Sequence, residues 1–566
     1  MLVRENARKN PEKIACLYLE NDQVEKDKIS YKNLDRKASL VAQALNDFFK
    51  DAKGRCVILL FPTGIDFIIS FLGCSYAQAI AVPVTWPAHL RNTKELSQLK
   101  SIIQETKAEI MLVPSEFNQI KKDVDHDLGI NIFDISQVEM IKEGIDELPI
   151  YEENTISHLQ FTSGSTSTPK GVIIKQASLM HSLYSASSLW NFTEHSISLT
   201  WAPHTYAYGL LYCLLLPLYK GALSIIMSSE AFIKSPLCWL NAISKYKVTH
   251  SGSSNFAYDY CVSEISENNI QDLDLSCWKS AINGGEPIQQ ETLIAFSQKY
   301  NQYHFKLENF ICCYGMSEAA GLIACNTFQN RPNLFHFNKK ALRSNTLLLE
   351  DQHDRTKTFL GYAHRVPELQ ITIRDVKTLE VLNHNKVGEI WLTGPTCSCG
   401  YWEIETDIYQ NNLAHSENYP SIRTGDLGCL YDNQLIVMGR IKELLVIADK
   451  NYFPVDIELS AANSYNKLKK GSNAVFVISN GSKDEVVLVQ VVLQDVNENE
   501  YLSIVHAIHH AVKQEHNLII DRIVLIENNQ LAKTPSGKVQ RGLCKKLYIS
   551  HELEIKYEWR HFKNIG

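Results

Sequence analysis

The stretch LQFTSGSTSTPKGVIIK, residues 159–175, places a loop of small and hydroxyl-bearing residues between two β-type runs. Glycine and serine let backbone N–H groups come close to phosphate oxygens, and a lysine adds positive charge. We therefore predict a triphosphate-binding loop between two strands. The residues predicted to contact the phosphates are Thr162, Ser163, Gly164, Ser165, Thr166 and Lys170.

Two other interpretations of this loop need to be weighed. A Ser/Thr-rich surface turn is the plainer explanation of any such cluster, but the ordered string from strand to lysine disfavours it here. The common P-loop, GxxxxGK[ST], would need glycine where Pro169 stands and a hydroxyl residue where Gly171 stands. The loop therefore holds phosphate by a different pattern.

Short β-rich runs alternate with helical patterns on both sides of this loop. The β-rich runs are CVILLF at 56–61, AIAVPV at 79–84, EIMLVP at 109–114 and LSIIM at 223–227. Between them, residues 91–108 carry apolar side chains at helical spacing. This alternation predicts an α/β fold with mainly parallel, helix-covered sheets.

A second unit is expected towards the C-terminus. Residues 427–438, LGCLYDNQLIVM, predict a hairpin around Asp432 and Asn433, and compact α+β patterning follows. We predict a large ATP- and acid-binding body over residues 1–438. A small mobile α+β domain is predicted over residues 439–566.

Composition and charge narrow the class of protein. The chain has 566 residues, a formal net charge of -7 and no basic excess, so we expect no nucleic-acid partner. The fourteen cysteines include no CxxC pair, which disfavours a zinc site and a compact disulfide framework.

The expected location is cytoplasmic. The stretch MLVRENARKNPEKIA lacks the apolar run and cleavage site of a secretory signal, and reduced thiols fit the cytosol. Two uncharged stretches, residues 67–90 and 195–219, are long enough to span a membrane. Proline, glycine and polar residues interrupt both, so we expect core elements and no transmembrane segment.

Further motifs follow the loop along the chain. They are AINGGEPI at 281–288, YGMSE at 314–318, RTGDLG at 423–428, MGRIKE at 438–443 and LAKTPSGKVQR at 531–541. Together with the loop, which is similar to TSGSTGTPKG, they resemble the signature motifs of the adenylate-forming superfamily. The resemblance covers nearly the whole chain. It implies an enzyme that uses ATP and Mg²⁺ to join a carboxylic acid to AMP, with release of pyrophosphate.

The resemblance assigns roles in the nucleotide site. Tyr314 is implied to stack on adenine and Glu318 to help hold Mg²⁺, as suits an aromatic ring and a hard carboxylate. Taken singly, Tyr314 would more often be a core residue and Glu318 a solvated charge. The remaining residues implied to bind the nucleotide are Gly284, Gly285, Glu286, Pro287, Gly315, Met316 and Ser317.

Four residues near the predicted domain boundary and in the C-terminal domain complete the implied site. Asp426 is implied to accept hydrogen bonds from both ribose hydroxyls, and Arg440 to reach the ribose. Lys538 is the implied catalytic lysine and Lys442 the hinge, so adenylation would require the C-terminal domain to close over the body. The plainer alternative for each is an exposed charge or a surface ion pair of little energetic value.

Within the superfamily, the chain most resembles the fatty acyl-AMP ligases. Residues 331–357 are similar to the insertion that separates these ligases from acyl-CoA synthetases, an insertion thought to obstruct the thioester-forming rearrangement. Phe335, Phe337 and Leu342 are candidate anchors, and a loose surface loop is the alternative. The resemblance implies a fatty or related carboxylic acid as substrate. Its acceptor would be an acyl carrier protein or the carrier domain of a polyketide or peptide synthase.

The chain departs from the family pattern at two places that bear on activity, and Ala448, Asp449 and Lys450 also replace an Arg-Gly-Arg run of the family. Ser167 replaces a glycine of the phosphate loop. In WAPHTYAYGL, residues 201–210, Tyr206 and Ala207 stand where the family has histidine and aspartate. That segment borders the acid pocket in the family, so Tyr206, Tyr208 and Gly209 are weak candidates for contact with the acid.

Two alternative functions remain open from the sequence. An acyl-CoA synthetase would share the first half-reaction. A non-catalytic protein that binds nucleotide or acyl-adenylate is suggested by the two departures, whereas the retained Lys538, Glu318 and Asp426 favour an enzyme. A hydrolase is disfavoured because neither GxSxG nor HExxH occurs.

Overall fold

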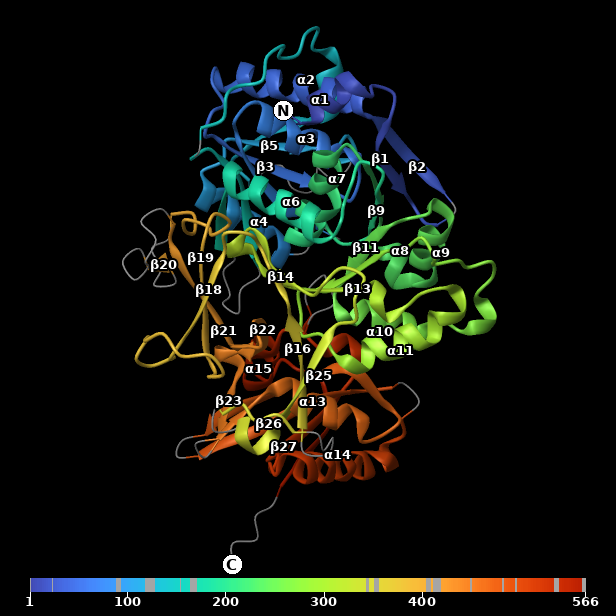
Figure 1. Ribbon diagram of the computed structural model, residues 1–566, viewed down its shortest axis with the longest axis vertical. Helices are drawn as coiled ribbons and strands as arrows, with labels where there is room; N and C mark the ends of the chain where they lie inside the picture. The colour runs from blue at the N-terminus through green and yellow to red at the C-terminus, as the bar shows by residue number, and fades with distance from the viewer. Residues whose placement is uncertain are drawn as a thin grey trace, which may run out of the picture.

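The computed structural model shows a large body, at the top and centre of Figure 1, and a smaller C-terminal unit at the bottom. The described residues are 2–22, 24–87, 93–117, 128–152, 154–162, 170–342, 346–350, 356–403, 409–410, 419–447, 450–480, 483–493, 496–533 and 539–561.

The strands that flank the phosphate loop belong to a six-stranded sheet. In spatial order its strands are β6 (Asn131–Asp134), β5 (Ile110–Val113), β3 (Cys56–Phe61), β4 (Ile80–Thr85), β7 (Ile156–Thr162) and β8 (Lys170–Lys175). Only β7 and β8 pair antiparallel. Ile58 packs with the helix α4 (Thr93–Thr106), whereas Leu59 packs in the core that contains α2 (Tyr31–Phe49) and α3 (Ile65–Tyr76). Because helices cover both faces, the run CVILLF is apolar throughout.

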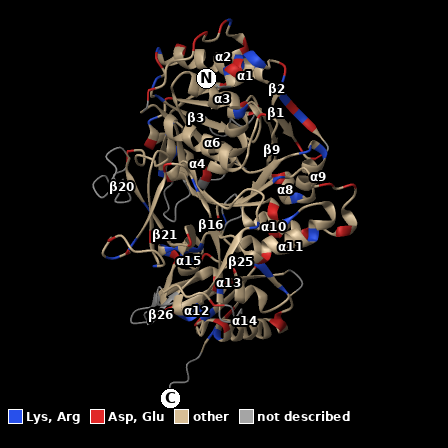
Figure 2. Cartoon of the chain, in the orientation of Figure 1, with Lys and Arg blue, Asp and Glu red and all other residues tan. Residues whose placement is uncertain are grey.

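A nine-stranded sheet forms the second layer of the body. Its order is β17 (His364–Arg365), β14 (Gly321–Cys325), β13 (Phe310–Met316), β12 (Ser280–Gly284), β11 (His250–Ser253), β9 (Ile197–Thr200), β10 (Leu223–Met227), β1 (Ile14–Leu19) and β2 (Glu25–Ser30). The strands from β13 to β1 run parallel, and the edge strands are antiparallel. The outer strand β2 alternates acidic and basic side chains, as Figure 2 shows, and charge of this kind protects a sheet edge from further pairing.

Helices and buried aromatic rings support this second sheet. Trp239, Tyr258 and Trp278 are fully buried and their rings are in mutual contact. The remaining helices of the body are α1 (Leu2–Lys9), α6 (Gln176–Leu189), the π-helix η3 (Tyr208–Leu215), α7 (Leu216–Lys220), α8 (Ser229–Lys234), α9 (Leu237–Tyr246), α10 (Asn255–Glu264), α11 (Gln290–Tyr300) and α12 (Lys339–Leu342). The 3-10 turns are Ile135–Met140, Glu267–Asn269, Asn301–Tyr303, Leu307–Asn309, Ser317–Ala319, Ile441–Glu443, Glu498–Glu500 and Asn528–Gln530.

A third, antiparallel sheet forms the part of the body next to the C-terminal unit in Figure 1. Its order is β15 (Asn333–Asn338), β16 (Thr356–Tyr362), β22 (Gln434–Arg440), β21 (Ser421–Tyr431), β19 (Gly388–Thr393) and β18 (Gln370–Arg374), with β20 (Tyr409–Gln410) beside β21. The predicted hairpin around Asp432 and Asn433 is confirmed: both residues have positive φ, 47° and 57°, as a type I′ turn requires.

The segment 331–357 contributes β15, α12 and the start of β16 to this sheet. Phe337 is fully buried and Leu342 is buried beside it, in a cluster that also contains Cys429 and Ile436. The ring of Phe335 lies 5.4 Å from that of Tyr431. The described part of the segment is therefore packed on the body through the three predicted anchors. Its identity as a ligase-specific insertion stays a prediction.

The C-terminal unit has a sheet and hydrophobic clusters of its own. The strands are β25 (Leu468–Asn480), β26 (Lys483–Val492), β27 (Arg522–Ile526) and β28 (Ile555–Arg560), and a short hairpin joins β23 (Leu445–Ile447) to β24 (Lys450–Tyr452). The helices are α13 (Pro454–Asn463), α14 (Tyr501–His516) and α15 (Arg541–Ile549). The helices α13 and α14 pack on one face of the sheet and α15 on the other.

The predicted α/β class, with a small α+β unit at the C-terminus, is confirmed. The boundary before Gly439 stays a prediction: β22 continues to Arg440, and the cluster of the C-terminal unit begins at Leu445. Among the described residues, every helix is either too short or too polar to traverse a lipid bilayer.

Candidate active site

The antiparallel pair β7 and β8 holds the two ends of the phosphate loop. Thr162 lies opposite Lys170 in the strand register, which brings the ends of the loop together. The four predicted loop contacts between these ends, and the departure at Ser167, lie outside the described residues: Ser163, Gly164, Ser165 and Thr166. Their phosphate-binding role stays a prediction.

An aromatic residue that the motifs did not indicate joins Lys170 to Glu318. The Nζ of Lys170 lies 5.2 Å from the centroid of the Tyr401 ring. The hydroxyl of Tyr401 donates a hydrogen bond to Oε1 of Glu318 at 2.6 Å. The backbone N–H of the next residue, Trp402, donates to the carbonyl of Gly171, which fixes Tyr401 beside β8. The only signal in the sequence is the aromatic pair that follows Gly400.

The two predicted ribose-binding residues lie beside Tyr314: Asp426 is in the middle of β21, Arg440 ends β22, and Tyr314 is near the end of β13. The hydroxyl of Tyr314 donates to Oδ2 of Asp426 at 2.6 Å, and Nε of Arg440 lies 3.5 Å from Oδ1. Burial and the neighbouring Asp426 raise the pKa of Tyr314, so its hydroxyl keeps its proton. Asp426 is therefore oriented from both sides. The stacking role of Tyr314 and the ribose roles of Asp426 and Arg440 stay predictions.

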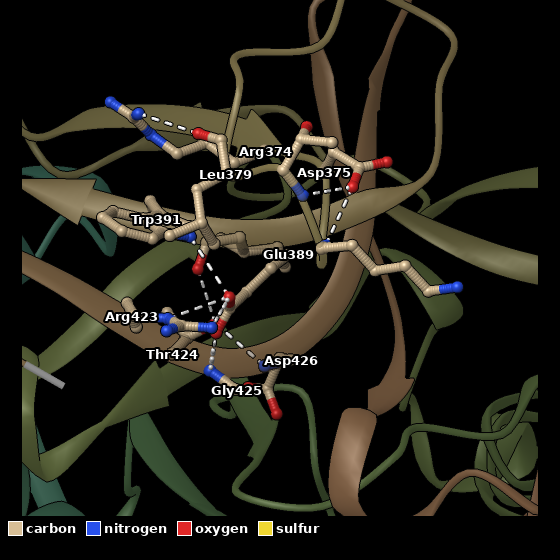
Figure 3. Close-up of polar contacts among 12 residues, drawn as sticks. Arg374, Asp375, Leu379, Glu389, Trp391, Arg423, Thr424, Gly425 and Asp426 are labelled. Carbon is tan, nitrogen blue, oxygen red and sulfur yellow. Dashed lines mark hydrogen bonds and ion pairs between the residues drawn. The ribbon is translucent and has the colours of Figure 1, made fainter. Parts of the chain in front are cut away.

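A buried ion pair supports the turn that carries Asp426, as Figure 3 shows. Glu389 on β19 is 2% exposed and accepts hydrogen bonds from Nη2 of Arg423 at 2.8 Å and from the backbone N–H of Gly425 at 3.2 Å. Gly425 has a φ of 70°, a conformation that favours glycine. The motifs did not identify Glu389, because its role depends on the pairing of β19 with β21.

The adenine motif lies next to the YGMSE motif. Gly284, at the end of β12, pairs with Cys313, the residue before Tyr314. Gly285 and Pro287 flank Glu286, whose Oε1 accepts a hydrogen bond from the backbone N–H of Phe256 at 2.6 Å. Their roles in binding adenine stay predictions.

The YGMSE motif itself turns sharply to present Glu318. Gly315 and Met316 end β13, and Ser317 begins the 3-10 turn that carries Glu318. A Cβ on residue 315 would lie 2.3 Å from the carbonyl oxygen of Gly321, so the close return of the chain requires glycine there. Glu318 thus projects from a turn fixed by backbone packing.

Glu318 is suited to a magnesium ion that is bound mainly through a nucleotide. Within the described ranges, no three His, Cys, Asp or Glu side chains gather as a metal cage. Mg²⁺ commonly binds one or two carboxylates together with substrate phosphates, and needs no such cage. The donor set at Glu318 therefore fits this ion.

The segment that was predicted to border the acid pocket lies beside β7, the strand that precedes the predicted phosphate loop. Nε2 of Gln160, two residues before the end of β7, donates to the carbonyl of Thr205 at 2.5 Å. Tyr206, Tyr208 and Gly209 follow directly and enter the π-helix η3. His204 is buried and stacks on Phe67 at 3.8 Å, so it does not replace the family histidine. Contact with the acid stays a prediction for all three candidates.

Of the two lysines to which the motifs assign roles near or in the C-terminal unit, only Lys442 is among the described residues. Lys442 is exposed in the 3-10 turn directly after Arg440, and Lys538 lies outside the described residues. Burial lowers the pKa of Lys533, five residues before Lys538, and the charge of Glu286 in the adenine motif acts against that shift. The hinge and catalytic roles stay predictions.

The fold and this site define a nucleotide-binding enzyme. Residues 3–402 match the family model described as AMP-binding enzyme, and residues 442–558 match that of the Disco-interacting protein 2-like AMP domain. The chain belongs to the AMP-binding enzyme family, which confirms the resemblance found in its motifs.

Known relatives cover nearly the whole chain. The medium-chain-fatty-acid–acyl-carrier-protein ligase JamA of Moorena producens (strain JHB) is 32% identical over 558 residues, which cover 95% of this chain and 93% of JamA. The crystal structure of a fatty acyl-adenylate ligase from L. pneumophila in complex with acyl adenylate and pyrophosphate has 31% identity and a TM-score of 0.75, covering 99% of this chain and 97% of that chain. A structure from work on the fatty acyl-adenylate ligases of E. coli and L. pneumophila has 26% identity and a TM-score of 0.87, covering 97% of each chain.

Proposed function

We propose that this chain activates a fatty acid with ATP, releasing pyrophosphate and forming acyl-AMP, and that the acyl group then passes to the thiol of a carrier protein. The observation that carries this proposal is a pair of contacts among the motif residues. Tyr314 and Arg440 both contact Asp426, and Tyr401 contacts both Glu318 and Lys170. Relatives named as acyl-carrier-protein ligase and acyl-adenylate ligase support the acid and the acceptor.

The reaction requires mainly that the carboxylate and the α-phosphorus are aligned and that positive charge lies near the phosphate oxygens. The carboxylate of the acid attacks the α-phosphorus of ATP and pyrophosphate leaves, so negative charge develops on the phosphate oxygens. Lys170 would hold the phosphates that leave, and Asp426 with Arg440 would hold the ribose. Glu318 would bind Mg²⁺, which supplies charge neutralisation to the phosphates when bound. Lys538 would bring positive charge to the α-phosphate from the C-terminal unit.

One contact between the body and the C-terminal unit favours acyl-AMP over a CoA thioester as the product released. Nζ of Lys357, the last residue of the segment 331–357, lies 2.7 Å from Oδ2 of Asp456 on α13. The same amine lies 3.8 Å from the centroid of the Phe453 ring. The contact ties α13 to the body, and it must break before the C-terminal unit can rotate to a thioester-forming position.

Carrier transfer and a cytoplasmic location are the finer parts of the proposal. All fourteen cysteines are free, which suits a reducing compartment. A carrier protein and CoA both present a phosphopantetheine thiol. The choice between them would therefore depend on the surface of this protein around the site where the thiol enters.

Pyrophosphate exchange across a panel of acids tests the proposal. We expect ATP–pyrophosphate exchange with medium- or long-chain fatty acids and acyl transfer to a phosphopantetheinylated carrier protein. Exchange without carrier transfer but with rapid acyl-CoA formation would favour an acyl-CoA synthetase. No exchange with any acid would favour a non-catalytic binding protein.

A further inference from the structure

Arg541, the first residue of α15, links three parts of the C-terminal unit. Its Nε and Nη2 donate to the two carboxylate oxygens of Glu458 on α13, both at 2.7 Å. Its Nη1 donates to Oε2 of Glu443 at 2.6 Å. Glu443 directly follows Lys442, the predicted hinge, and Arg541 stands three residues after Lys538.

The geometry of this contact makes it stiff. A guanidinium that binds one carboxylate through two nitrogens has its plane fixed, unlike a single flexible ion pair. The side chain of Arg541 is 17% exposed and that of Glu458 is 8% exposed. Oε1 of Glu458 also accepts a hydrogen bond from the backbone N–H of Val475 on β25, so the acceptor is itself anchored to the sheet.

The described residues on the two sides of 534–538 are paired with each other. Lys533 and Val539 form an antiparallel bridge, and the backbone N–H of Gln540 donates to the carbonyl of Ala532 at 2.9 Å. Nζ of Lys533 donates to the buried hydroxyl of Ser472 at 2.9 Å. Residues 532–533 and 539–540 therefore lie side by side, and Arg541 connects them to the chain after the hinge.

We infer that Arg541 is a positioning residue that makes the described residues on either side of 534–538 move as one body with the residues directly after the hinge. The inference rests on the proposed function, because it assigns the purpose of this rigidity to adenylation. A rotation at Lys442 also moves Glu443. Because Arg541 binds both Glu443 and Glu458, α15 and α13 would rotate together with Glu443. Without this contact, Lys538 would reach the α-phosphate in varied positions. Because such misalignment acts on the chemical step, it should lower kcat strongly and change the KM values little.

A buried ion pair can also serve stability alone, and the chain offers a matched control for that alternative. Arg522 on β27 is 15% exposed, and its Nε donates to Oε2 of Glu485 at 2.8 Å. Its Nη1 donates to the hydroxyl of Tyr548 at 3.2 Å. Arg522 equals Arg541 in burial and in partner type, but it contacts neither the chain after the hinge nor α13.

The inference is tested with three variants of the full-length chain. Their steady-state adenylation is measured by pyrophosphate exchange. Glu443→Gln and Arg541→Lys should lower kcat about tenfold with the KM values for ATP and acid within twofold of wild type. Arg522→Lys should leave kcat within twofold, even where thermal melting shows that it destabilises the protein as much as Arg541→Lys. An equal fall of kcat in Arg522→Lys and Arg541→Lys, or an unchanged kcat in both Glu443→Gln and Arg541→Lys, would overturn the inference.

Hydrogen exchange separates this inference from the proposed function. In Glu443→Gln, the amides of residues 532–540 should exchange faster than in wild type, while those of α14 remain unchanged. If the wild-type protein showed no pyrophosphate exchange, the proposed function would be wrong. The hydrogen-exchange result in Glu443→Gln would still support the linkage through Arg541. Unchanged exchange over 532–540 in Glu443→Gln would defeat the linkage itself.

Discussion

The ribose side of the site and the attachment of the C-terminal unit are built in contrasting ways. Around Asp426, neighbouring strands of one sheet supply Glu389, Arg423 and Arg440, so the groups are held by continuous backbone pairing. The C-terminal unit is joined to the body through discrete contacts such as Lys357–Asp456. The first arrangement gives a fixed binding surface, and the second can be broken and remade during a catalytic cycle.

The largest effect is expected at Lys538, the proposed catalytic lysine of the C-terminal unit. Replacing Lys538 by alanine should lower kcat for adenylation by a factor on the order of 100 to 1000 with little change in the KM for ATP, because its charge is needed only as the transition state forms. Pyrophosphate exchange measures this. Lys546→Ala removes an exposed lysine from α15 and should retain the wild-type rate. A large KM effect with normal kcat would place Lys538 in ground-state binding.

On the fixed side, Glu389→Ala should destabilise the protein by about 3 kcal/mol, because it leaves the guanidinium of Arg423 without its carboxylate. Urea unfolding measures the loss. The KM for ATP should rise as well, since the turn at Gly425 loses its acceptor. Glu380→Gln, at an exposed position of the same region, should change stability by less than about 0.5 kcal/mol. Equal stability of the two variants would show that the ribose side is not organised by Glu389.

Breaking the contact between the two regions should have an intermediate effect. Lys357→Met should lower the free energy of unfolding by about 1 kcal/mol, because the pair is partly exposed and partly screened. With CoA supplied, this variant should form acyl-CoA faster than wild type, since α13 is no longer tied to the body. Lys340→Met alters an exposed lysine of α12 and serves as the control. The same CoA rate in all three proteins would remove the contact from product selection.

The smallest expected effect concerns pH. Burial, and secondarily the charge of Lys469, lower the pKa of Lys533 to about 8 from an ordinary 10.5. Between these two values the unfolded chain binds more protons at this site than the folded protein, so the contribution of Lys533 makes stability rise with pH. Comparing urea unfolding of wild type and Lys533→Met from pH 9.5 to 10.5 should isolate a rise of about 1 kcal/mol. Parallel curves for the two proteins would contradict it.

Much of the fold could be predicted from local sequence. The run CVILLF is β3 because a strand covered on both faces is apolar at every position, and the hairpin at Asp432 and Asn433 follows from two residues that tolerate positive φ. The order of the motifs placed Tyr314, Glu318 and Asp426, which the structure brings together through β13 and β21.

The missed residues depend on pairing between distant segments. Glu389 reaches Gly425 only because β19 lies antiparallel to β21, and Tyr401 reaches Glu318 only because the chain after β19 returns to β8. Lys357 and Asp456 are far apart in the sequence, and nothing local marks them as partners. Single-sequence patterns report burial and turn chemistry, whereas these contacts require the register of the assembled sheets.

Tyr401 contacts two side chains of opposite charge, the amine of Lys170 and the carboxylate of Glu318. It lies between an amine that is suited to phosphate and a carboxylate that is suited to a cation, and the two make no direct ion pair in this structure. Because the two charges do not neutralise each other, both remain available to an incoming complex of Mg²⁺ and ATP.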